Sequence, residues 1–95
     1  MGQHMKHTWK SFLTLCLKTR DTEELSRLLD CFLTFEEIEA ITDRFSIIKA
    51  LLEEKQTQRD MSESLNVSIA KITRGSNALK TIDPKLKVFL EKNML

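Results

Sequence analysis

The sequence contains only two glycines, one proline and no tyrosine in 95 residues. Turn-rich all-β folds and flexible linkers need residues that bend or extend the backbone, so this scarcity argues against both. Cysteine is scarce as well: Cys16 and Cys31 stand alone, without the close spacing of zinc ligands, and we expect both to be reduced, small core residues. The composition favours one all-α domain without a metal.

Long apolar runs are also missing. No segment approaches the roughly 20 consecutive apolar residues of a membrane span, and the first dozen residues lack the apolar centre of a signal peptide. We therefore expect a cytoplasmic protein with no membrane partner. Residues 1–4 precede a second methionine and resemble a cloning remnant, so residues 5–95 are taken as the domain.

A large charge of one sign is absent too, because the net charge is only +1. The distribution is uneven: residues 5–55 carry eight Lys and Arg against ten Asp and Glu, a net charge of −2, whereas residues 56–95 carry seven against four, a net charge of +3. The C-terminal part is therefore the part suited to an anionic partner.

Apolar residues at spacings of three and four predict six helices joined by short turns, with N-terminal capping signatures at Asp21, Thr34, Thr57, Ser68 and Asp83. The expected helices cover about residues 6–19, 22–32, 35–54, 58–65, 69–81 and 84–95. We expect the third to carry Ile38, Ile41, Phe45, Ile48 and Leu52 on one face, the fifth to turn Ile69, Ile72 and Leu79 inward, and the last to turn Leu86, Phe89 and Leu90 inward. The first helix is apolar on more than one side, which suggests burial against another chain.

Residues 57–81 fit a helix-turn-helix. Two short helices flank Asn66-Val67-Ser68, and Val67 and Ile72 are suited to pin the second helix across the first. Small, polar or basic residues then remain outward on the second helix, where they can approach a DNA groove: Ser68, Ala70, Lys71 and Thr73. The alternative is a pair of packed helices with a merely solvated face.

The segment Arg74-Gly75-Ser76-Asn77 is unfavourable in an ordinary helix interior, because glycine costs about 1 kcal/mol there and serine and asparagine compete for backbone hydrogen bonds. A glycine beside an arginine allows close backbone approach next to a planar cation, which suits an anionic or aromatic ligand. The alternative interpretation is a poorly formed helix end.

These residues carry a resemblance to a known family. The run Ile72-Thr73-Arg74-Gly75-Ser76-Asn77, together with residues 58–65, the Thr34 and Glu37 pair, and Arg44, closely resembles the tryptophan repressor family over about residues 25–90. The resemblance implies an intertwined six-helix homodimer, with dimerisation helices in residues 5–55, a helix-turn-helix in residues 57–81 and a C-terminal helix in residues 83–95. It further implies a bacterial repressor that binds operator DNA when L-tryptophan, its corepressor, sets the separation of the two DNA-reading heads.

The resemblance also implies a ligand site. The indole ring would lie between Arg44 and Arg74, the carboxylate would be held by Arg74 and Thr34, and Gly75 would leave room for the ring. The backbone carbonyls of Cys31 and Leu33 would accept hydrogen bonds from the ammonium group, with the Thr34 loop supplied by the opposite subunit. Without the family, an ion pair of Arg44 with Glu37 or Glu39 would be the simpler interpretation.

We expect two sets of DNA contacts. The residues that face the groove are Arg59, Ser68, Ile69, Ala70, Lys71 and Thr73. The residues nearer to phosphate are Ser76, Asn77 and Lys80.

The chain departs from the family pattern at three places. Lys71 stands where the family usually has a smaller polar residue, and Ala78 replaces a serine that helps to hold the ligand in the family. Asn66-Val67-Ser68 replaces a turn that contains glycine in the family.

Two other functions stay open at this point: a ligand-independent DNA-binding protein of the same fold, and a helical protein-interaction module. Nothing in the sequence indicates an enzyme or an enzyme cofactor, because it has no glycine-rich phosphate loop and no spacing of metal ligands.

Overall fold

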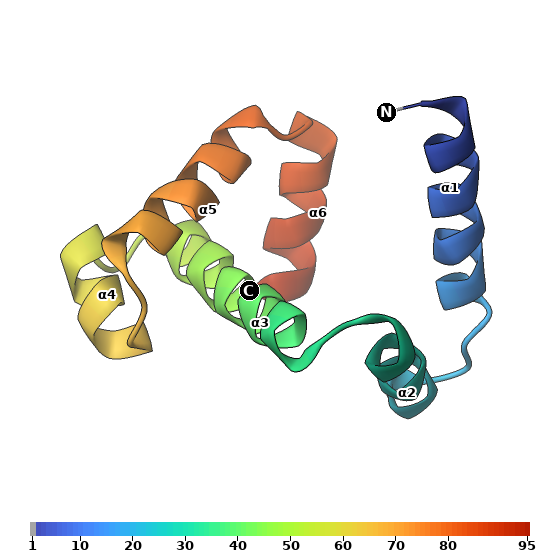
Figure 1. The fold of residues 1–95 in the computed structure, drawn as a ribbon. Helices are drawn as coiled ribbons and strands as arrows, with labels where there is room; N and C mark the ends of the chain where they lie inside the picture. The colour runs from blue at the N-terminus through green and yellow to red at the C-terminus, as the bar shows by residue number, and fades with distance from the viewer. Residues whose placement is uncertain (1) are drawn as a thin grey trace. The chain divides into compact units, whose positions relative to one another are not determined.

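A computed structural model describes residues 2–95, which form six α-helices and no strand (Figure 1). The helices are α1 (Gln3–Leu17), α2 (Thr22–Phe32), α3 (Phe35–Glu53), α4 (Gln58–Leu65), α5 (Ile69–Thr81) and α6 (Pro84–Met94). The all-α prediction is confirmed, and the boundaries lie close to the expected ones. The helix α1 begins at Gln3, inside the segment that the sequence suggested was a cloning remnant.

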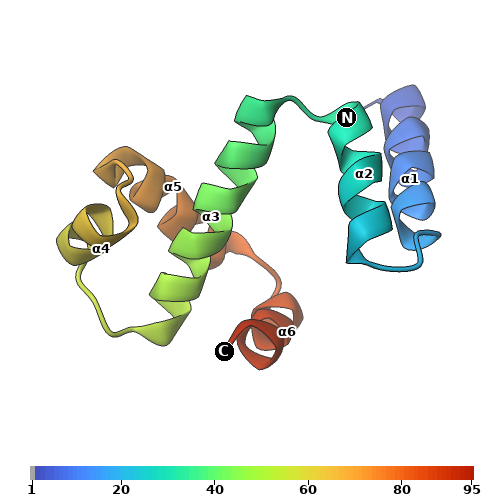
Figure 2. The ribbon, with the colours of Figure 1, turned by 90° about the horizontal axis from the view of Figure 1, so that it is seen from below.

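The chain divides into two compact units, one up to Phe35 and one from Glu36 to Leu95. In the first unit a short connection joins α1 to α2 (Figure 2), and the Phe12 and Phe32 rings meet edge to face with their centroids 5.1 Å apart. Asp21 caps α2 by accepting a hydrogen bond from the Glu24 N–H at 2.8 Å. Neither helix contains a buried residue.

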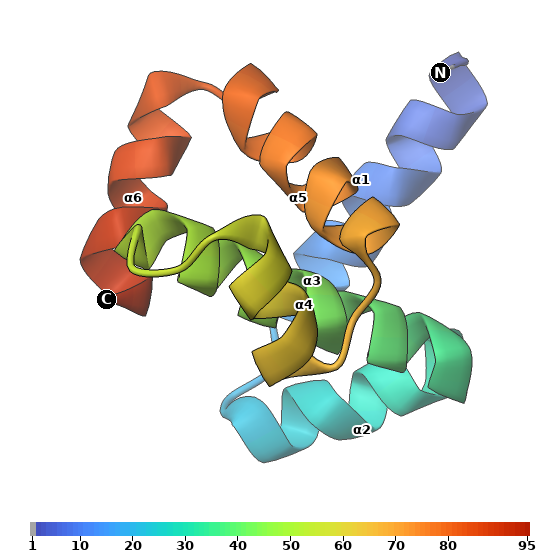
Figure 3. The same cartoon turned by 90° about the vertical axis from the view of Figure 1, so that its left-hand side faces the viewer.

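The second unit has a small core where α3, α4 and α5 meet. Ile47, Met61, Val67 and Ile72 are buried there, and Ala50, Leu51 and Leu65 pack around them. Figure 3 shows the short turn that joins α4 to α5, with both helices against α3. Val67 and Ile72 are buried in this core and pack α5 against α4, as the helix-turn-helix pattern predicted.

Local hydrogen bonds fix the ends of these helices. The Asp60 N–H donates to Thr57 Oγ1 at 3.1 Å and the Thr57 N–H donates to Asp60 Oδ2 at 3.4 Å, which is a capping box. Asn66 ends α4 in the left-handed conformation, with φ 55° and ψ 48°. Ser68 caps α5 and Asp83, followed by proline, caps α6.

Several expected inner faces are not buried within the chain. Ile41 and Phe45 of α3 are 57% and 55% exposed, whereas Ile47, which the sequence analysis did not select, is 1% exposed. The other three residues of this expected face, Ile38, Ile48 and Leu52, are half-buried, and the core of the second unit uses a second apolar face of α3 that carries Ile47. Four further expected core residues are also exposed: Cys31, Ile69, Leu86 and Phe89.

Candidate ligand and nucleic-acid site

The helix α5 packs closely against α3 at Gly75, which is buried. A Cβ atom at this position would come within 2.7 Å of Ile47 Cγ2 and 3.6 Å of Arg44 Cδ. The first distance is shorter than real Cβ contacts allow, and a β-branched methyl group on a buried isoleucine has little freedom to move. Glycine is therefore required for this helix contact, and it brings the Arg44 side chain alongside α5.

Arg44 and Arg74 flank this contact from α3 and α5, and both are exposed. Within residues 2–95 neither arginine forms an ion pair with an acidic side chain. The simpler interpretation for Glu39, in which it neutralises Arg44, is therefore not supported. Two uncommitted guanidinium groups near a glycine are suited to an anionic or aromatic ligand.

The six predicted ligand residues are divided between the two units. Arg44, Arg74 and Gly75 belong to the second unit, and the contact of α3 with α5 brings them together. Cys31, Leu33 and Thr34 belong to the first unit, at the end of α2 and in the connection to α3.

The helix α5 presents a largely exposed face at the residues expected to meet DNA. The exposed members are Ser68, Ile69, Ala70, Lys71, Thr73, Asn77 and Lys80, and Ser76 is half-buried. Two hydroxyl groups are already used by the backbone: Ser68 Oγ accepts from the Lys71 N–H at 3.2 Å, and Thr73 Oγ1 donates to the Ile69 carbonyl at 3.0 Å. At the start of α5, the side chains that could face a DNA groove are therefore mostly small or apolar.

Two of the expected DNA-contacting cations have acidic neighbours. Lys71 Nζ donates to Asp43 Oδ2 at 2.9 Å, which links α5 to α3. Arg59 Nε lies 3.8 Å from Glu63 Oε1 one turn along α4, and both side chains are highly exposed. The second pair is weak in water, whereas the first is a short hydrogen-bonded contact with a half-buried carboxylate.

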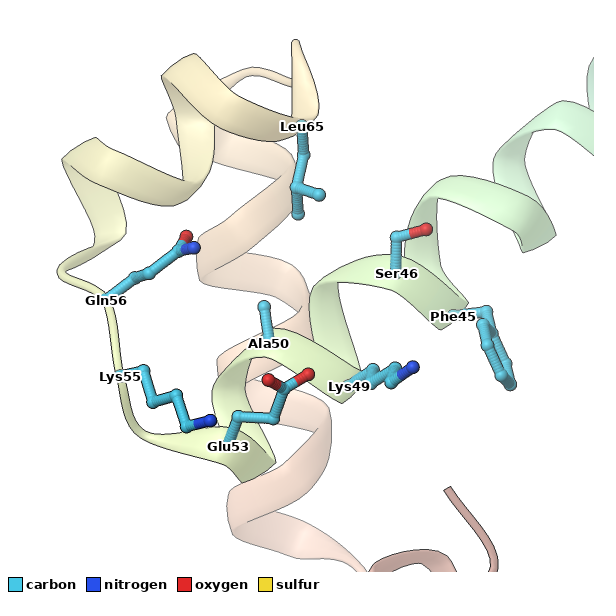
Figure 4. A pocket seen from close by; sticks show the side chains of 8 residues that line it. All are labelled: Phe45, Ser46, Lys49, Ala50, Glu53, Lys55, Gln56 and Leu65. Atoms are coloured by element: carbon cyan, nitrogen blue, oxygen red, sulfur yellow. The ribbon is translucent and has the colours of Figure 1, made fainter. Parts of the chain in front are cut away.

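Elsewhere in the second unit, a hollow of about 350 Å³ lies between α3 and α4 and contains none of the predicted site residues. Figure 4 shows Leu65 of α4 pointing toward Ala50 of α3, while Phe45 points away from α4. We assign no ligand to this hollow.

Across residues 2–95, no helix is both long and apolar enough to cross a membrane. The same residues contain no group of three or more His, Cys, Asp or Glu that could hold a metal ion.

The family model described as "Trp repressor protein" matches residues 7–94. The chain belongs to the Trp repressor family. Similar curated proteins are each named "Trp operon repressor homolog". The one from Chlamydia trachomatis serovar D is 50% identical over 86 residues, covering 90% of this chain and 92% of that protein. The Chlamydia caviae protein is 52% identical over 83 residues, covering 87% and 82%, and the Xylella fastidiosa M23 protein is 35% identical over 89 residues, covering 94% and 95%.

The Trp repressor family consists of DNA-binding transcription regulators rather than enzymes. The sequence analysis missed two residues that contact the predicted site residues: Ile47, which approaches Gly75, and Asp43, which pairs with Lys71. Ile47 could have been found from its place one turn before Leu51 on the second apolar face of α3. Asp43 pairs with a residue 28 positions away, and a single sequence carries no signal for that contact.

Proposed function

We propose that this Trp repressor family member is an L-tryptophan-dependent transcriptional repressor that binds operator DNA as a homodimer. The observation that carries the proposal is the pair of arginines, Arg44 and Arg74, held on facing helices by the close contact at Gly75 with no acidic partner in residues 2–95. The names of the relatives, each a "Trp operon repressor homolog", agree with it.

In the proposed mechanism the tryptophan indole stacks between the Arg44 and Arg74 guanidinium groups, because planar cations pack well on aromatic faces. Arg74 and Thr34 hold the carboxylate, and the carbonyls of Cys31 and Leu33 of the partner subunit accept from the ammonium group. Since the ligand bridges residues of both chains and touches α5, its binding sets the separation of the two heads on DNA. The exposed face of α5 then enters the major groove.

The experiment starts by selecting duplexes from a randomised pool with the purified protein and L-tryptophan, and it then measures binding of a selected duplex with and without tryptophan. We expect much tighter binding when tryptophan is present. Equal binding in both conditions contradicts the corepressor role and supports the ligand-independent alternative, which the alanine at position 78 favours. No binding at low salt contradicts DNA recognition altogether.

Arg74→Gln tests the ligand site directly by isothermal titration with L-tryptophan. Loss of a charge-assisted hydrogen bond and of the stacking cation predicts an affinity lower by about 10- to 100-fold. Lys80→Gln is the matched control, because it removes the same charge from the same helix outside the ligand site. We expect this control to keep its tryptophan affinity while losing some affinity for DNA.

A further inference from the structure

An ion pair between Asp43 and Lys71 joins α3 to α5 in the second unit. Nζ and Oδ2 lie 2.9 Å apart, and the side chains are 28% exposed for Asp43 and 46% for Lys71. Part of the carboxylate is therefore shielded from water, so salt screens this attraction less than it screens a fully exposed pair.

The other basic residues of α5 differ from Lys71 in having no acidic partner in the part of the chain that the structure describes. Within residues 2–95, Arg74 and Lys80 have no acidic partner, so their charges are available to a ligand or to phosphate. Lys71 is thus the basic residue of α5 whose charge is balanced inside the protein. It sits one turn before Gly75, and Asp43 precedes Arg44, so the pair lies beside the contact that carries the proposed tryptophan site.

We propose that Asp43 is a positioning residue that holds the Lys71 ammonium group against α3 and keeps it from neutralising a DNA phosphate. This inference rests on the proposed function, because it concerns how the chain binds DNA. The pair lowers the sequence-independent part of the affinity, which comes from phosphate contacts. The small side chains at the start of α5, such as Ala70, then carry a larger share of the recognition.

The test measures the affinity for the selected duplex, with saturating L-tryptophan, across a range of salt concentrations. Asp43→Asn keeps the size of the side chain but removes its charge, so Lys71 becomes free to contact phosphate. Each added phosphate contact steepens the slope of log K against log salt by about 0.9. A dimer gains one contact in each half-site, so Asp43→Asn binds DNA more tightly than wild type at low salt. The ratio of the variant's affinity to the wild-type affinity falls about 12-fold between 50 and 200 mM salt.

Two control variants separate this effect from a change in total charge. Glu39→Gln also removes one negative charge from α3, one turn before Asp43, but in residues 2–95 Glu39 has no cation to release. It is expected to keep the wild-type slope. The double variant Asp43→Asn/Lys71→Gln replaces the ion pair by two neutral groups and should return the slope to the wild-type value.

The direction in which each variant changes the DNA affinity and the salt slope tests the inference. If Lys71 already binds phosphate and Asp43 only orients it, Asp43→Asn binds equally or more weakly, and the inference is overturned. An equal steepening in Glu39→Gln overturns it as well. These outcomes are distinct from failure of the proposed function, in which the wild-type protein itself does not bind duplex DNA at low salt. Circular dichroism on each variant checks that the helices are intact.

Discussion

At the scale of single residues, Gly75 decides how α3 and α5 meet. The glycine occupies a helix interior, where alanine would be favoured by about 1 kcal/mol on propensity alone. Its Cβ position is nevertheless blocked by Ile47 Cγ2 at 2.7 Å. Because Ile47 is 1% exposed and its branched side chain is stiff, neither helix can accommodate the methyl group without moving.

Gly75→Ala should lower the free energy of unfolding. Overpacking costs about 1–3 kcal/mol, and the gain in helix propensity offsets part of it, so we expect a net loss of about 1 kcal/mol. Chemical denaturation at a fixed protein concentration measures it.

Ile47→Ala supplies the control for this prediction, because it removes the blocking methyl group. In the Ile47→Ala background the Gly75→Ala substitution should be neutral or stabilising. An equal penalty in both backgrounds would mean that the clash with Ile47 is not the cause.

At the scale of elements, the turn between α4 and α5 sets the direction of α5. Asn66 adopts the left-handed conformation, with φ 55°. Ser62 Oγ donates to the Val67 carbonyl at 2.6 Å, and Val67 is buried against Ile72. Asparagine tolerates this conformation better than other residues with a Cβ atom, which explains how the chain makes the turn without glycine.

Two substitutions at Asn66 test the cause of this turn. Asn66→Ala should destabilise the protein by about 1 kcal/mol, because alanine in the left-handed region brings its Cβ close to the following carbonyl oxygen. Asn66→Gly should be neutral or slightly stabilising, since glycine adopts this conformation freely. Thermal unfolding of the two variants beside wild type gives the comparison. Equal melting temperatures for the two variants would show that the backbone conformation at Asn66 costs nothing.

At the scale of the whole molecule, the apolar surface left uncovered is large for a chain of 95 residues. The second unit buries only Ile47, Met61, Val67 and Ile72 as its apolar core, while many other large apolar side chains are exposed. They include Trp9, Leu13 and Leu17 on α1, Ile41 and Phe45 on α3, and Leu86, Val88 and Phe89 on α6. Such surface is typical of a chain that completes its core with a partner, in agreement with the proposed homodimer.

Phe45→Lys should dissociate the proposed dimer. The ring points away from α4 (Figure 4) and is 55% exposed, so its apolar area is free for a second chain. An unpaired ammonium group buried there costs about 3 kcal/mol in each chain of a symmetric dimer, which raises the dimer dissociation constant by about 10,000-fold. Sedimentation velocity at micromolar concentration measures the change.

Ser64→Lys introduces the same charge at an exposed polar position of α4 and should leave the dimer intact. A wild-type protein that sediments as a monomer would contradict the homodimer itself.

The sequence alone determined the helices and their ends, because capping and periodicity are local: Thr57 with Asp60, Ser68, and Asp83 with Pro84 all cap as predicted. It also singled out Arg74 and Gly75, because the run Arg74-Gly75-Ser76-Asn77 is costly in a helix unless a contact requires it, whereas Arg44 was selected only through the family resemblance. The tertiary structure decided which apolar face of α3 is buried, that Gly75 packs against Ile47, and that Asp43 neutralises Lys71. These contacts join residues 28 positions apart, and a single sequence records no preference between the surfaces that its helices could bring together.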